Sequence, residues 1–507
     1  MTVVHDSPAG LPAALAPPPP IRVRVEERVL PAHVPLDLYT AARRQLGPDV
    51  YLFESPEGPW QDSGTAVVGF GRLAEIQVHA GHITVRGTEA IAGAVLRAAD
   101  RLGMTASGQD SRAIGTPEQV WELLRAAQRS FELDTARPEG EFAFGFLAAF
   151  GYGSAWHMEQ LPPREAAGPD VVLTLFSDTV WYGADGAVRH LRAASADFGG
   201  CGFDPADGIV LTEETEAAGQ PAPVPAAPAP QSVRDSLTRQ EFLARAERCL
   251  EHIRVGDIYQ IQIGHSIDVR TTLRPLDVYR RLKSRNPSPH MYLVPRAGDT
   301  LIGASPELLL RIDGSRIEMR PIAGTAPRGP DEEVNRERVA RLRASEKERA
   351  EHVMLVDLCR NDIGRVARTG SLDVPVQQTV EAFSHVFHLV SVVEGQLAED
   401  ADIWSAVRAV FPAGTVTGTP KIRAMELIEE LEHTPRDMYA GAVGLVDVRG
   451  WSRLALCIRT IVHDGLGYRT QACAGIVADS ESAAEWHETL HKMGAAHWAL
   501  TGGELLP

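Results

Sequence analysis

The sequence has few cysteines, no long apolar run and a deficit of positive charge. Its 507 residues include five cysteines, an odd number, and none of them stands in a C-x-x-C pair. Such a set builds no disulfide framework and favours a reduced, cytoplasmic protein. No apolar run approaches the ~18 residues of a membrane-spanning helix, and the N-terminus lacks the charged start and apolar core of a signal peptide. Fifty basic against 67 acidic residues give a net charge of −17, which argues against nucleic-acid or membrane partners.

Proline marks the expected boundaries. Residues 1–20 end in APPPP and predict a disordered tail, and residues 216–236 contain the Pro/Ala-rich stretch AAGQPAPVPAAPAP, typical of a semi-rigid linker. We therefore expect an N-terminal regulatory or structural domain at 21–215 and a catalytic domain at 237–507. Strand and helix patterns mix in both, which indicates an α+β or α/β protein with large sheets. Within the first domain, 140–153 predicts a buried strand pair, and 171–177 with 179–182 predicts a hairpin.

Carboxylates continue the apolar stripes of two expected helices. Ser345 and Glu348 form a capping box, and Glu348, Glu351, Leu355 and Leu358 then share one side of the helix. A buried ionised carboxylate is costly unless it is paired or binds a metal.

A second helix repeats this pattern near the C-terminus. Ser482 and Glu485 form another capping box, and Glu485, Glu488 and Lys492 share a face. Four carboxylates on two helix starts suit an oxygen-ligated cation such as Mg²⁺. The alternative is that Glu348 and Glu485 only cap, while Glu488 and Lys492 form a solvated ion pair.

Several peptides are too specific to reflect secondary-structure propensity alone. They are SPELLLRI (305–312), RPIAGTAPRG (320–329), EKERAEHVMLVDLCRNDIG (346–364), FSHVFHLVSVVEGQL (383–397), FPAGTVTGTPKIRAMELIEELE (411–432), YAGAVGLVD (439–447), LCIRTIV (456–462) and QACAGIVADSESAAEWHETLHK (471–492). Together they resemble the chorismate-utilising enzymes, and most of all the large component of anthranilate synthase, densely over 238–495. The resemblance implies an α+β fold of two large antiparallel β-sheets packed as a sandwich, with helices outside.

The resemblance also implies a reaction centre. Glu351 and Glu488 match the Mg²⁺ ligands, with Glu348 and Glu485 beside them, and the cation would hold the ring carboxylate of chorismate. Glu307 matches the general acid for the C4 hydroxyl, a role that needs a raised pKa, which neighbouring carboxylates can supply. A strand-end surface glutamate is the alternative for Glu307.

Further motif positions match groups that bind the substrate. Tyr439 and Arg459 match the residues that hold the enolpyruvyl carboxylate, and a bidentate guanidinium suits that task. The carboxylate-binding turns are Gly324 with Thr325, and the backbone of Cys473, Ala474 and Gly475. Here the sequence departs from the family, since CAG replaces GAG, and the Cys473 Cβ is expected where the substrate approaches. Lys492 either supplies charge to the ring carboxylate or pairs with Glu488. His388 matches a histidine placed against the ring during pyruvate loss, with a satisfied core histidine as the alternative; His385 is expected to be structural.

Three positions distinguish reactions within the family. Relatives that add water carry a lysine base where Gln260 stands, and an amide cannot deprotonate water. Relatives that use a covalent amine carry a lysine where Ala323 stands. Thr415 matches members that complete pyruvate elimination. We therefore expect ammonia to attack C2 of chorismate and the product to become anthranilate.

Two other hypotheses remain open at this point. One is the same chemistry halted at 2-amino-2-deoxyisochorismate, and the other is an inactive paralogue that acts as a regulatory subunit. No cysteine sits in a G-x-C-x-G nucleophile turn, so a glutamine amidotransferase subunit should deliver ammonia in a hetero-oligomer.

An effector site is the last expectation. Tryptophan-regulated relatives use a serine that closes an LLES motif together with a Pro-x-Met segment, and here Ser55 and the run Pro289, His290, Met291 match them. Phe53 and His290 replace a leucine and a tyrosine of that pattern. We expect weak or absent feedback by tryptophan, because each misplaced contact lowers the affinity of such a pocket.

Overall fold

The computed structural model describes residues 19–56, 58, 62–200, 202–206, 224–383 and 386–506. Most of the expected tail, residues 216–223 of the expected linker, and His385 lie outside the described residues. The strands are β1 (Ile21–Leu30), β2 (Tyr51–Ser55), β3 (Thr65–Val78), β4 (His82–Gly87), β5 (Thr105–Gly108), β6 (Ser111–Ala113), β7 (Phe131–Asp134), β8 (Gly145–Phe150), β9 (Val171–Tyr182), β10 (Val188–Ala194), β11 (Ser232–Asp235), β12 (Gln260–Arg270), β13 (His290–Arg296), β14 (Asp299–Ser305), β15 (Leu308–Asp313), β16 (Arg316–Met319), β17 (Ile322–Pro327), β18 (Asp373–Ala382), β19 (Val386–Gln396), β20 (Gly418–Thr419), β21 (Ala442–Asp447), β22 (Ser452–Leu456), β23 (Thr460–His463) and β24 (Tyr468–Ile476). The helices are α1 (Pro35–Leu46), α2 (Glu89–Arg101), α3 (Pro117–Gln128), α5 (Arg239–Arg254), α6 (Pro275–Arg285), α7 (Glu332–Ala344), α8 (Glu346–Gly364), α9 (Ile403–Val410), α10 (Lys421–Leu431) and α11 (Ser482–Thr501), with 3₁₀ turns η2 (Tyr152–His157) and η3 (Gly414–Val416).

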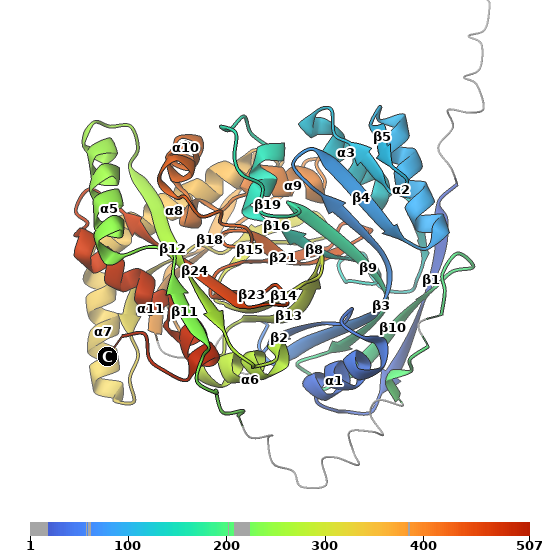
Figure 1. Ribbon diagram of the computed structural model, residues 1–507, viewed down its shortest axis with the longest axis horizontal. Coiled ribbons are helices and arrows are strands. Elements are labelled where there is room, and N and C mark those ends of the chain that lie inside the picture. Colours follow the sequence, from blue (N-terminus) through green and yellow to red (C-terminus); the bar gives the residue numbers. More distant parts are fainter. Residues whose placement is uncertain are drawn as a thin grey trace, which may run out of the picture.

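Two arms of antiparallel strands run from the long paired strands β3 and β9 (Figure 1). One arm continues from β3 through β2, β13, β14, β23 and β24 to β12. The other continues from β9 through β8, β21, β22, β15 and β16 to β19. Side chains of both arms belong to one buried apolar cluster, so the arms pack face to face. This confirms the expected α+β fold, and β3 and β9 join its two sheets into one hydrogen-bonded network.

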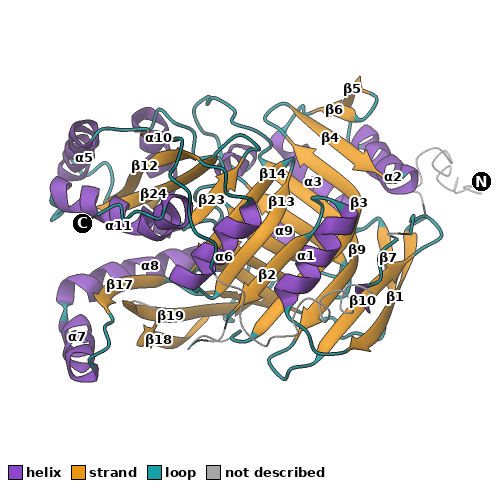
Figure 2. Cartoon of the chain, turned by 60° about the horizontal axis from the view of Figure 1, so that its bottom comes forward, coloured by secondary structure: helices purple, strands orange, loops and turns teal. Residues whose placement is uncertain are grey.

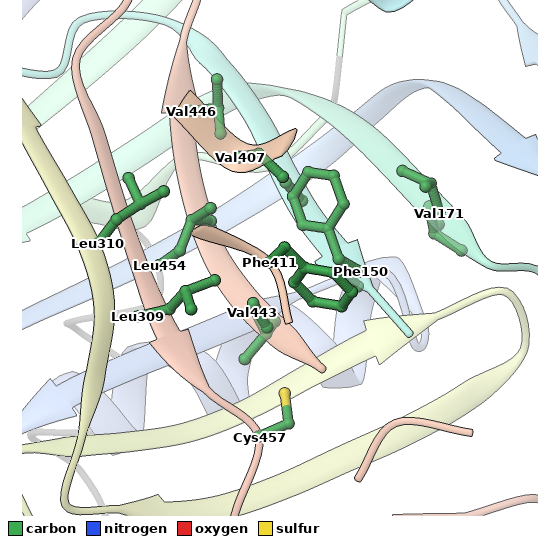
Figure 3. Close-up of a cluster of buried hydrophobic side chains, with 14 of the residues drawn as sticks. Phe150, Val171, Leu309, Leu310, Val407, Phe411, Val443, Val446, Leu454 and Cys457 are labelled. Atoms are coloured by element: carbon green, nitrogen blue, oxygen red, sulfur yellow. The ribbon is translucent and has the colours of Figure 1, made fainter. Parts of the chain in front are cut away.

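Helices cover the outside of this sandwich (Figure 2). At one end, α5 and α11 pack on β12 and β24, and α6 packs on β13 and β14 beside α11. The helices α7 and α8 pack against β17, and α8 also contacts β19. The helix α9 covers the second arm, where Figure 3 shows Val407 and Phe411 beside Phe150, Val443 and Leu454. The four glutamates expected at the metal site stand near the starts of α8 and α11.

Strands from before and after the expected linker share the same sheets. The strand β2 pairs with β13, and β8 pairs with β21. The division at 216–236 stays a prediction. No helix in the described part of the chain combines the length and apolar composition needed to cross a bilayer. The four described cysteines, Cys249, Cys359, Cys457 and Cys473, are buried and free.

The structure confirms one of the two predicted helix caps and contradicts the other. Ser345 caps α8 by accepting a hydrogen bond from the Glu348 N–H at 3.3 Å, as predicted. The predicted cap at Ser482 is wrong, because Glu481 occupies the N-cap position and the Ser482 hydroxyl donates to Glu247 of α5.

Two predicted strand pairs are also wrong. Residues 140–153 form only one strand, β8, which runs directly into the turn η2, and 171–182 is the single strand β9. The latter stays continuous because Asp178, at the expected turn, is buried and accepts hydrogen bonds from His190 and Arg192 of the neighbouring strand.

Candidate active site

Glu307 follows β14 and is a buried carboxylic acid. Its side chain accepts a hydrogen bond from the Thr415 hydroxyl at 3.0 Å. Burial raises its pKa to about 7, against the opposing effects of Thr415, Lys492 and Arg459. The expected raised pKa is therefore present, but its cause differs from the expectation, since burial raises it and no neighbouring carboxylate is needed. A carboxylic acid with this pKa is half protonated near neutral pH and can donate a proton there.

The four expected carboxylates meet between α8 and α11. Burial raises the pKa of Glu351, and the charges of Glu348, Glu488 and Glu485 raise it further. Burial likewise raises the pKa of Glu485, with a contribution from Glu488. These mutual effects mean that the carboxylates at the starts of the two helices lie within electrostatic range of one another.

These carboxylates fit a divalent cation in chemistry, although they do not form a closed cage. The described residues contain no group of three His, Cys, Asp or Glu side chains already arranged around one point. Instead, Lys347 Nζ lies 3.9 Å from Glu351, and Lys492 pairs with Glu488. An all-oxygen donor set suits Mg²⁺, which usually takes one or two carboxylates and keeps several waters.

Arg459 is held in a strained conformation beside the acid. Its φ of 51° lies in the left-handed region, which non-glycine residues seldom adopt. Among the described residues, its guanidinium has no hydrogen bond or ion pair. Burial lowers its pKa, while Tyr439, Glu488 and Glu307 raise it. A half-buried, unpaired guanidinium between a tyrosine and two carboxylates is available for an anionic ligand.

The backbone of β24 contacts Tyr439 and Lys492. The Cys473 N–H donates to the Tyr439 hydroxyl at 3.0 Å, and the Cys473 carbonyl accepts from Lys492 Nζ at 2.9 Å. The Cys473 side chain packs against Gly264 of β12 and lies 3.7 Å from Glu432 Oε1. Its thiol therefore fills the space left by a glycine on the partner strand, and burial raises its pKa to about 12. Ala474 beside it is fully buried.

His388 of β19 lies against the Gly324 turn. Its Nδ1 is 3.2 Å from the Gly324 carbonyl and 3.1 Å from the Thr325 hydroxyl. Because a carbonyl only accepts, Nδ1 carries the proton and Nε2 keeps a lone pair. Burial lowers the pKa of His388 to about 4, with further lowering by Arg459 and Lys492, so the ring is neutral. Gly324 has a φ of 71°, and a side chain there would meet Leu389 and Glu348 at 3.0 and 3.2 Å.

Gln260 begins β12 and is buried next to β24. Its Nε2 lies over Gly475, where an added Cβ would be only 3.1 Å away, and its Oε1 has no hydrogen-bond partner. Thr419, directly opposite on β20, also has a buried hydroxyl without a partner. Unpaired buried polar atoms are rare in native proteins. The Gln260 side-chain carbonyl oxygen and the Thr419 hydroxyl are therefore available to form hydrogen bonds with a ligand.

A family model described as chorismate binding enzyme matches residues 60–497. The chain belongs to this family. It is 46% identical over 496 residues to the 2-amino-4-deoxychorismate synthase of Streptomyces globisporus, covering 96% of this chain and 98% of that protein. It is 43% identical over 384 residues to anthranilate synthase component 1 of Streptomyces coelicolor, covering 72% and 74%.

Solved structures agree with this family assignment. Anthranilate synthase component I from Streptococcus pneumoniae matches with a TM-score of 0.67 and 28% identity, covering 86% of this chain and 93% of that chain. MenF, the menaquinone-specific isochorismate synthase from Escherichia coli, shares the fold at a TM-score of 0.66 and 16% identity, covering 96% and 97%. The chain is thus a chorismate binding enzyme close to anthranilate synthase component I.

The two halves of the expected effector site line one cavity of this chorismate binding enzyme. Ser55 meets Pro289, His290 and Met291 in a cavity of about 70 Å³. At ~30 Å³ per water in the liquid, this volume corresponds to about two waters, which is small for an indole. Burial lowers the pKa of His290 to about 4, so its ring is neutral.

A buried ion pair behind β24 was not foreseen. Glu432 and Arg436 bond to each other at 2.8 Å, with side chains only 5% and 2% exposed. Arg436 also donates to the carbonyls of Val416 and Gln262, and Glu432 accepts from the Gly264 N–H at 2.9 Å. The i,i+4 spacing of an acid and an arginine was visible in the sequence, but such pairs are usually solvated.

Proposed function

We propose that this enzyme aminates C2 of chorismate with ammonia and releases 2-amino-4-deoxychorismate. The observation that carries the proposal is Glu307, a buried acid with a pKa of about 7 that lies beside Arg459 and Lys492. A leaving hydroxyl needs a proton donor at neutral pH, and an anionic substrate needs the two cations.

The reaction follows from the groups present. Ammonia forms a bond to C2, the ring double bonds shift, and the C4–O bond breaks as Glu307 gives its proton to the departing hydroxyl, which leaves as water. The new ammonium group at C2 then loses a proton. Arg459 and Tyr439 would hold the enolpyruvyl carboxylate, with Gly324 and Thr325 at the ring carboxylate. When bound by Glu351 and Glu488, Mg²⁺ would supply positive charge to the ring carboxylate.

Two residues favour ammonia over other nucleophiles. The neutral amide of Gln260 cannot generate hydroxide, and Ala323 of β17 offers no amine for a covalent intermediate. Ammonia would come from a glutamine amidotransferase partner. The nearly full-length similarity to a protein named 2-amino-4-deoxychorismate synthase supports release at this stage. That name describes nitrogen at C2 and loss of the C4 oxygen, the same connectivity as 2-amino-2-deoxyisochorismate.

Anthranilate is the second candidate product, and His388 favours it. The Nε2 lone pair of a neutral ring could accept the C2 proton while the C3–O bond breaks and enolpyruvate departs, to become pyruvate on protonation. The similarity to anthranilate synthase component 1 proteins supports this alternative.

One assay decides between the two candidates. The purified chain is incubated with chorismate, Mg²⁺ and ammonium chloride, the products are separated by chromatography, and pyruvate is measured by a coupled enzyme. We expect 2-amino-4-deoxychorismate without pyruvate. Anthranilate with equimolar pyruvate would establish the second candidate, and isochorismate or salicylate would refute amination altogether.

A further inference from the structure

A cavity of about 230 Å³ lies behind β24, apart from the groups assigned to chorismate. Its walls come from the turn η2, from residues 164–170, and from the end of α10 with the loop that follows. The polar lining residues that matter here include Tyr152, Arg164, Asp170, Glu429, Glu432 and Arg436. At ~30 Å³ per water in the liquid, this volume corresponds to about eight waters.

The charges that remain in this cavity are negative. Arg164 pairs with Asp170, and Arg436 pairs with Glu432. Asp437 lies 3.0 Å from Arg296. Glu429 and Glu165 have no ion pair among the described residues. Burial raises the pKa of Glu429, and the charge of Glu432 adds to this. Binding of another carboxylate would therefore be disfavoured here, and binding of a small nitrogen cation favoured.

A buried hydroxyl without a partner points to the same kind of ligand. Tyr152 is 4% exposed, and its hydroxyl makes no hydrogen bond. Burial raises its pKa well above the usual value, Arg436 opposes this, and Glu432, Glu429 and Cys473 add to it, so the hydroxyl stays protonated. An O–H donor between carboxylate acceptors complements ammonia, which offers a lone pair and three N–H groups.

Polar groups continue from the floor of the cavity toward the reaction centre. Glu432 contacts Cys473 at 3.7 Å and the Gly264 N–H at 2.9 Å. Gln262 and Gln260 follow on the same face of β12 and cover Gly475, and the row ends at the unpartnered carbonyl of Gln260. Cys473 Sγ fills the space beside Gly264, and the side-chain amides of Gln262 and Gln260 occupy the space over Gly475, so polar and sulfur atoms line this layer.

We propose that this cavity is the entry site for ammonia, with the Tyr152 hydroxyl and Glu429 as its binding groups and Gln260 Oε1 as the acceptor at the end of the path. The inference rests on the proposed use of ammonia as nucleophile. It gives the nitrogen source a route separate from the metal side, where α8 and α11 meet chorismate.

Tyr152→Phe is the sharpest test, with ammonium chloride as the probe at fixed pH. The variant removes an unbonded hydroxyl, so the fold should tolerate it, and we expect the KM for ammonium to rise about fivefold, the effect of one hydrogen bond. The KM for chorismate and the kcat at saturating ammonium should stay unchanged. Glu429→Gln should act similarly, while Glu430→Gln, on the exposed side of the same helix, should not.

A plug at the cavity wall gives a second, independent measurement. Gly168 lines the cavity and has open space around its missing Cβ, so we expect Gly168→Trp to narrow the cavity and to raise the KM for ammonium alone. Gly140→Trp is the matched control, since Gly140 has similar space but lies outside the cavity. An unchanged ammonium KM in Tyr152→Phe, or a parallel rise in the chorismate KM, would overturn the entry site. Absence of any ammonium-dependent product from the unmodified chain would instead overturn the proposed function.

Discussion

The ionisation of Glu307 should govern the pH dependence of the enzyme. A carboxyl group with a pKa of about 7, raised from 4.5, is half protonated at pH 7. With an ordinary pKa it would be only about 0.3% protonated at that pH. Because the protonated form is the active acid, kcat measured at saturating chorismate and constant free ammonia should be high below pH 6 to 7 and should fall as the pH rises through about 7.

Thr415 offers a perturbation of known sign. Its hydroxyl donates to the ionised carboxylate and thereby lowers the pKa of Glu307. Thr415→Val removes a hydrogen bond to a charged group, worth about 1.5–3 kcal/mol. The pH at which kcat falls should therefore rise by about one to two pH units. A kcat that stays constant from pH 6 to 8, or one that falls at a lower pH in Thr415→Val than in the unmodified enzyme, would refute the reasoning.

The same shift predicts a stability change that does not depend on catalysis. Glu307 ionises at lower pH in the unfolded chain than in the folded protein, so the folded state loses stability as the pH rises from about 4.5 to 7. The shift of about 2.5 units corresponds to about 3 kcal/mol. Glu307→Gln cannot ionise, so the difference in unfolding free energy between the two proteins, followed by chemical denaturation across this range, should change by this amount. A pH-independent difference would contradict burial as the cause.

Three further predictions concern the metal, the product and the effector cavity. Glu351→Gln and Glu488→Gln should each abolish turnover at any Mg²⁺ concentration while circular dichroism stays unchanged, and Glu346→Gln, on the exposed start of the same helix, should be active; wild-type-like rates in the first two would remove them from the metal site. If some anthranilate forms, His388→Asn should lower it at least tenfold while 2-amino-4-deoxychorismate persists in chromatography, since the loss of a general base costs about 10²–10⁴-fold; unchanged anthranilate would exclude His388 as the base. Tryptophan at micromolar concentration, with chorismate near its KM, should inhibit little; strong inhibition that is lost in Ser55→Ala would show that the small cavity opens for it.

The sequence predicted helix starts well where a cap depends on neighbouring residues. Ser345 caps α8 as predicted, and Thr238 with Glu241 forms the same kind of local cap at the start of α5. Ser482 failed because its hydroxyl contacts Glu247, 235 residues away along the chain. A pattern of a few residues can predict a cap that depends on neighbouring residues. It cannot predict a contact with a residue that is distant in the sequence.

The candidate site shows the same limit. Motif positions indicated which carboxylates belong together, and their mutual effects on the pKa values agree with that grouping. The source of the raised pKa of Glu307 was predicted incorrectly. Desolvation depends on everything packed around the carboxyl group, including the Thr415 loop more than a hundred residues away, and no local pattern reports it.

Cys473 shows how strand pairing decides the effect of a substitution. From the motif alone, a cysteine in place of glycine adds a Cβ where the substrate should approach. In the sheet, Cys473 stands opposite Gly264, and a Cβ added at Gly264 would lie 2.6 Å from the Cys473 sulfur. The side-chain volume on one strand thus occupies space that the partner strand leaves open, and the thiol lies toward Glu432. The Cys473 backbone still reaches Tyr439 and Lys492. The departure from the family motif therefore alters the packing behind the strand, on the side from which ammonia is proposed to enter.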